Sequence, residues 1–248
     1  MGVSIHYRLS LRPKAPDLDD LYARWAVEEA RKLALKMKRR KVFDAVGPMR
    51  WDYESRKWNR EYYDFPQPPV PERPRSSYVI EPLPAEGHLF EIDPGRDCES
   101  LWIGLCRYPK TERACGREFR VPRGPAWRLK RFAKTQYASL HGWEHFRRCH
   151  VGIVDFLSAL RPLGFDVKIS DEGNYWPRRS ERALREEVGM MNRVIAAAAG
   201  AMKDAFGDDG GVESPIFAHP QFERLEAEGV AARPELPEAI ARVAEAPE

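Results

Sequence analysis

The chain has 248 residues, of which 43% are hydrophobic and 32% charged, and its formal net charge is +3. This length suits one large domain with an insertion or a tail. No run approaches the roughly 18 apolar residues of a membrane span, and the first residues alternate instead of forming the apolar core of a signal peptide. We therefore expect a water-soluble, cytoplasmic protein with no membrane partner.

The first predicted strand covers residues 3–12, where apolar and polar side chains alternate strictly, as in a strand with one buried face. A helix follows from Asp17, a suitable N-cap, to about Lys38, with apolar residues at helical spacing. Residues 43–84 then lose all periodicity and include the proline-rich run PQPPVPERPR. We interpret them as an aromatic and proline-rich insertion anchored on the domain surface.

Short strands are predicted at residues 78–80, 88–92 and 101–106, with further candidates at 118–121 and 131–137. A second helix is expected at about 140–160, a strand at 165–170 and a third helix from Ser180 to Phe206. Residues 207–248 carry ten acidic residues against three Arg. They are predicted to be an acidic, mobile tail with at most a short helix near 237–244.

This order of elements predicts an α+β fold with one mixed sheet and helices on one face. It matches a ferredoxin-like βαββαβ unit with insertions and an extra C-terminal helix. Residues 1–206 would form a single domain that includes the 43–84 insertion.

The densest group of polar residues surrounds the second predicted helix. His150 lies in the middle of its apolar stripe, Lys134 and Gln136 precede the helix, and Asp171 and Glu172 end the following strand. A buried histidine is usually a core residue bonded to a neighbour. Alternatively, His150 and a carboxylate could act as acid and base while Lys134 and Gln136 orient a polar or anionic substrate.

Metal and cofactor chemistry has little support in the sequence. The cysteines at 98, 106, 115 and 149 form no CxxC pair, so we expect free thiols. His141 and His145, four residues apart with Glu144 between them, could hold zinc as in an inverted zincin, but surface histidines near a helix start are the more ordinary interpretation. No glycine-rich phosphate loop is present, and the sequence requires no cofactor.

A basic segment with interleaved aromatics favours an anionic partner. Residues 107–134 hold ten Lys or Arg, including Arg131, against two Glu. Together with Arg8 on the polar face of the first strand, they could bind single-stranded nucleic acid or dock the acidic tail. Aromatics of the kind found on RNA-binding sheets are, however, missing from the predicted outward face. Tyr175 and Trp176 are further candidates for binding, or else they pack on the sheet edge.

Three motifs, SIHY at 4–7, KTQYA at 134–138 with His150 beyond it, and DEGNYW at 171–176, resemble those of an uncharacterised bacterial protein family. The resemblance covers less than half of the chain and implies no activity. It does imply a recurring set of residues: Lys134, Gln136, His150, Asp171, Glu172, Tyr175 and Trp176.

Two functions remain open at this stage. One is a noncatalytic binding protein with a basic aromatic surface, and the alternative is an enzyme that uses the pocket around His150. They differ in what the fold must provide, because the enzyme needs the polar groups to converge in one hollow while the binding protein needs a continuous basic face.

Overall fold

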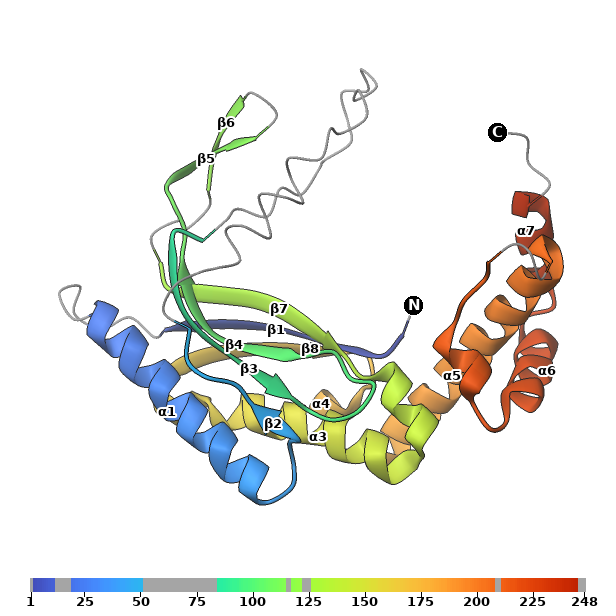
Figure 1. The fold of residues 1–248 in the computed structure, drawn as a ribbon, viewed down its shortest axis with the longest axis horizontal. Helices are drawn as coiled ribbons and strands as arrows, with labels where there is room; N and C mark the ends of the chain where they lie inside the picture. Colours follow the sequence, from blue (N-terminus) through green and yellow to red (C-terminus); the bar gives the residue numbers. More distant parts are fainter. Residues whose placement is uncertain are drawn as a thin grey trace.

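The structure, a computed structural model, describes residues 2–11, 19–50, 84–114, 117–121, 126–207 and 211–244. Its centre is a six-stranded sheet with the strand order β2-β3-β4-β7-β1-β8 (Figure 1). The strands are β1 Ser4–Leu11, β2 Ala45–Val46, β3 Glu86–Asp93, β4 Leu101–Arg107, β7 Arg128–Lys134 and β8 Phe165–Asp171. A separate two-stranded hairpin joins β5 Thr111–Ala114 to β6 Arg117–Arg120.

The fold is α+β, as predicted. Every strand pair that the structure describes is antiparallel, so the prediction of a mixed sheet was wrong in this respect. The order β8-β1-β7-β4, with α1 after β1 and α3 before β8, is compatible with a ferredoxin-like core. That topology stays a prediction, since β2 and β3 extend the sheet beyond it.

Alternation along β1 separates the two faces of the sheet. Ile5, Tyr7 and Leu9 are at most 2% exposed, whereas His6 and Arg8 are exposed. The helices α1 Asp19–Arg39 and α3 Trp143–Ala159 both lie against the apolar face (Figure 1). The predicted strand, its two faces and both helices are thus confirmed, with α3 starting three residues later than expected.

The sheet is loosely joined between β4 and β7. Only one residue pair, Cys106 with Arg128, links these strands. Across the opening, the Tyr7 hydroxyl donates to the Trp102 carbonyl at 2.6 Å. Complete burial raises the pKa of Tyr7. At the far end, Glu99 N–H donates to the Lys134 carbonyl and Lys134 N–H donates to the Glu99 carboxylate, each at 2.9 Å.

The C-terminal part contains more structure than the tail predicted for residues 207–248. Helix α5 Glu181–Phe206, capped by Ser180, is followed by η5 Pro215–Ala218, α6 Phe222–Ala232 and α7 Glu235–Ala244. These helices lie beyond the end of the sheet (Figure 1), and α5, η5 and α6 share a second small core of Ile195, Ala196, Ala199, Ile216 and Leu225. The predicted helix near 237–244 therefore starts at Glu235, and α6 was missed.

One predicted strand is shorter in the structure, and another lies where the structure gives no description. The strand expected at 131–137 ends at Lys134, and η2 Gln136–His141 begins after Thr135. The predicted strand at 78–80 and the proline-rich run lie outside the described residues. Within the described ranges, no helix is both long and apolar enough to cross a membrane.

A hollow at the end of the open sheet face

Three segments far apart in the sequence meet at one end of the sheet. They are residues 4–7 of β1, residues 134–138 at the end of β7, and residues 171–176 after β8. Ser4 pairs with Lys134, and Ile5 pairs with Asp171. Because side chains alternate along each strand, the converging residues divide into a buried layer beneath the sheet and an outer layer above it.

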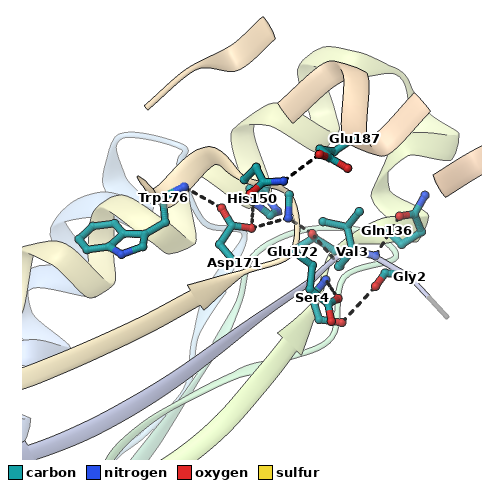
Figure 2. A network of polar contacts seen from close by, with 12 residues as sticks. Gly2, Val3, Ser4, Gln136, His150, Asp171, Glu172, Trp176 and Glu187 are labelled. Carbon is teal, nitrogen blue, oxygen red and sulfur yellow. Dashed lines mark hydrogen bonds and ion pairs between the residues drawn. The ribbon is translucent and has the colours of Figure 1, made fainter. Parts of the chain in front are cut away.

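His150 is the centre of the buried layer. Its ring is 0% exposed, with Nδ1 2.9 Å from the Thr135 hydroxyl and Nε2 3.0 Å from Asp171 Oδ1 (Figure 2). A carboxylate only accepts hydrogen bonds, so Nε2 donates to Asp171. Both ring nitrogens therefore have protein partners. This is the arrangement of a histidine that fixes structure.

Asp171 is held by further donors in the turn that follows β8. Gly173 N–H donates to Oδ1 at 2.7 Å and Trp176 N–H donates to Oδ2 at 2.8 Å. Burial raises the pKa of Asp171, but the hydrogen bond and charge of His150 and the two amides together outweigh burial and lower it. A Cβ at Gly173 would lie 2.9 Å from His150 Nε2, which explains the glycine after the two acids.

Gln136 anchors the start of β1 from the same buried layer. Its side-chain carbonyl accepts from Val3 N–H at 2.9 Å, and its amide nitrogen donates to Asn192 on α5. Gln136 is 0% exposed and Asn192 is 7% exposed. Of the five predicted catalytic residues, Gln136, His150 and Asp171 thus belong to one buried network that ties β1, α3, α5 and the β8 turn together.

The other two, Lys134 and Glu172, belong to the outer layer. They line a hollow of about 480 Å³ whose wall is completed by Gly2, Ser4, His6, Phe132 and Met191. One Glu172 oxygen lies 3.4 Å from His6 Nε2, and the other accepts from Ser4 N–H at 2.9 Å. The hollow combines a lysine, a carboxylate–imidazole pair and an aromatic ring.

The hollow continues into an open, basic sheet surface. Arg8 of β1 pairs with Lys130 on one side and with Lys168 on the other, so three exposed cationic side chains form a row across the strands. The next row contains His6 and Phe132, whose ring centroids lie 5.6 Å apart. Phe132 is 51% exposed, so one aromatic ring does lie on this outward face, where aromatics of the RNA-binding type were not expected.

The other predicted binding residues lie apart from this surface. Arg131 is half-buried opposite Tyr7 in the inward row. Tyr175 is only 9% exposed. The guanidinium groups of Arg161 and Arg179 lie over the Trp176 ring, at 5.0 and 4.6 Å from its centroid. Among these candidates, Arg8 reaches the open face.

Of the two histidines of the metal hypothesis, His141 ends η2 and His145 lies in the first turn of α3. His141 Nε2 contacts Asp97, and His145 Nε2 lies 2.9 Å from the Arg96 carbonyl. Within the part of the chain that the structure describes, no group of three or more His, Cys, Asp or Glu side chains could hold a metal ion.

Sequence reasoning overlooked several members of the site. Thr135 and Asn192 complete the buried network, while Ser4 and Met191 line the hollow beside Phe132, which the basic segment had already suggested as a stacking residue. Thr135 and Ser4 lie inside the recognised motifs, so strict alternation could have assigned each to its layer. Met191 and Asn192 come from α5, and no local pattern shows that this helix reaches the sheet end.

Comparison with family models, with curated proteins and with solved structures finds no match for this chain.

Proposed function

We propose that this protein binds single-stranded nucleic acid on the open face of its sheet, without catalysing a reaction. The observation that carries the proposal is the row of Lys130, Arg8 and Lys168, in register across three strands beside the exposed Phe132. Proteins that bind single-stranded nucleic acid without sequence preference combine two features: cations along the path of the phosphate backbone, and aromatic side chains on which the bases stack.

The hollow fits one nucleotide of such a strand. A base can stack on Phe132, Lys134 can neutralise a phosphate, and the free lone pairs of the Glu172 carboxylate can accept from an exocyclic amine. The row of three cations would then hold the adjoining phosphates. The exposed Asp166 at the margin of this face would repel phosphates. We therefore expect a bound strand to run over the cationic row and the hollow instead.

The enzyme hypothesis built on His150 receives less support. A general base must reach the proton that it abstracts. His150 is 0% exposed, and each of its ring nitrogens already lies within hydrogen-bond distance of a protein oxygen. We infer that His150 and Asp171 support the sheet end on which the binding surface is built.

The proposal is tested by fluorescence anisotropy with a labelled random-sequence oligonucleotide at increasing salt. The double variant Arg8→Gln/Lys168→Gln should bind more weakly and lower the slope of log K against log salt by about 1 to 2, since about 0.7 arises per neutralised single-strand phosphate. Lys36→Gln/Lys38→Gln, on exposed positions of α1 at the other face, removes the same charge and should leave the slope nearly unchanged.

Stacking is tested separately with Phe132→Ala. Loss of a base–aromatic stack worth about 1–3 kcal/mol corresponds to binding that is roughly 5- to 150-fold weaker, with an unaltered salt slope. No binding by the wild-type chain at low salt would refute the proposal. So would an equal loss in the α1 control variant, because the attraction would then come from net charge rather than from this face.

A further inference from the structure

A pair of thiols lies between the loop that joins β3 to β4 and helix α3. Cys98 belongs to this loop and is half-buried, while Cys149 on α3 is 0% exposed. The two thiols are close enough to shift each other's pKa, and a side-chain hydrogen bond between them is the first cause of both shifts. Gly95 lies close to both cysteines. Cys98 N–H donates to the Gly95 carbonyl at 3.1 Å, and a Cβ on Gly95 would lie 2.8 Å from Cys149 Sγ. The two sulfurs are therefore neighbours although 51 positions separate them in the chain.

The surroundings of Cys149 are polar. His145 Nε2 lies 3.8 Å from its Sγ and the Pro94 carbonyl lies 3.4 Å from it. The hydrogen bond from Cys98 lowers the pKa of Cys149, and the nearby Arg148 charge lowers it further, against the opposing effect of burial. The same hydrogen bond, and burial, raise the pKa of Cys98. By contrast, Cys106 sits in the apolar core, where burial raises its pKa to about 12.

We propose that Cys98 and Cys149 form a reversible disulfide by exchange with a low-molecular-weight disulfide such as oxidised glutathione. The inference rests on the placement of both thiols next to Gly95 and on the partial exposure of Cys98, and it is independent of nucleic-acid binding.

The exchange proceeds in two displacements. Cys98, the accessible thiol, loses its proton to solvent, and its sulfur attacks one sulfur of the small disulfide. An S–S bond to Cys98 forms, and the first small thiolate leaves. Cys149 then attacks Cys98 Sγ as the thiolate and expels the second small thiolate. The protein loses two electrons and two protons, and the small disulfide is reduced to two thiols.

Bond formation requires the two sulfurs to approach to about 2.05 Å. We expect the loop side of the pair to make this movement, because residues 94–100 belong to no helix or strand. Cys149, fixed on α3, is the rigid partner. The raised pKa of Cys98 makes the first displacement slow near neutral pH, so we expect its rate to increase with pH.

The test uses the full chain with Cys115→Ser, so that this cysteine, which lies outside the described residues, cannot pair. After incubation with oxidised glutathione, alkylation and peptide mapping should show a Cys98–Cys149 crosslink, a loss of two free thiols and full recovery with dithiothreitol. Cys106 should stay unmodified until the protein is unfolded. Adding Cys149→Ser should stop the reaction at a glutathione adduct on Cys98, and adding Cys98→Ser should prevent reaction in the folded protein.

Two results would overturn the inference. One is a folded wild-type pair that stays fully alkylatable after long incubation. The other is a stable glutathione adduct on Cys98 while Cys149 is intact, which would show that the second sulfur cannot reach the first. Circular dichroism establishes whether each variant is folded. If Cys149→Ser unfolds, the crosslink map of the chain that keeps both thiols decides the question alone.

Discussion

At the scale of single residues, Asp171 joins three donors, one on α3 and two in the turn that follows β8. His150 Nε2 and the amides of Gly173 and Trp176 all donate to its carboxylate. Asp171→Asn removes the charge and turns one acceptor into a donor, which leaves buried groups without proper partners. We expect the free energy of unfolding, measured in urea at pH 7, to fall by about 1–3 kcal/mol.

A neighbouring residue supplies the control for this change. Asp166 lies on the same strand but is exposed, so Asp166→Asn should alter stability by no more than about 0.5 kcal/mol. Equal effects of the two substitutions would contradict a structural role for the Asp171 network.

The lowered pKa of Asp171 also predicts how stability depends on pH. A carboxyl whose pKa is lower in the folded than in the unfolded chain binds fewer protons when folded. Its contribution is fully present above the unfolded value, near 3.8, and is lost as the pH falls through the folded value. The stability difference between wild type and Asp171→Asn should therefore be constant from pH 7 to about 5 and should shrink in acid. A difference that grows below pH 4 in urea titrations would contradict this assignment.

The residue scale also shows where sequence patterns stop being informative. Lys134, Gln136, His150, Asp171 and Glu172 could be grouped from their motifs, and all five lie at one sheet end. Their division into a buried network and an outer hollow depends on strand register, which pairs Ser4 with Lys134 and Ile5 with Asp171. Register is a long-range property, so a single sequence gives no direct access to it.

At the scale of elements, strong periodicity was sufficient for β1, α1, α3, β8 and α5. It failed for α6, which has four charged residues among its 11 and buries only Leu225 and Gly229. This helix is held by its contact with α5 instead of by a broad apolar face of its own. The contact is close, because a Cβ on Gly229 would lie 2.2 Å from the Arg193 carbonyl oxygen.

That contact gives a prediction with a matched pair of glycines. Gly229→Ala must push α6 away from the α5 backbone, and we expect a loss of about 1–3 kcal/mol and faster proteolysis between α5 and α6. Gly189→Ala on α5 meets only Arg193 Nη1, at 3.8 Å, and should stabilise the protein by about 0.5–1 kcal/mol through helix propensity. Losses of similar size in both variants would show that helix packing is not what distinguishes the two sites.

At the scale of the whole molecule, the thiol pair and the binding face are connected through the β3–β4 loop. Glu99 follows Cys98 directly, and it exchanges two hydrogen bonds of 2.9 Å with the backbone of Lys134, which lines the hollow. Closing a disulfide must draw Cys98 toward α3, and Glu99 with it. If both proposals hold, we expect the oxidised protein to bind a single-stranded oligonucleotide more weakly, because Lys134 is pulled from its position.

A thermodynamic cycle tests this connection. Anisotropy titrations of reduced and oxidised protein should differ by roughly 3- to 10-fold in Kd, within the usual range of coupling between sites. In Lys134→Gln, reduced and oxidised protein should bind the oligonucleotide equally, since the lysine charge whose position changes on oxidation is absent. Lys130→Gln, a control on the same strand away from the loop, should weaken binding in both states and preserve their ratio. An unchanged Kd on oxidation of the wild type would show that the loop moves without Lys134, and the two sites would then be independent.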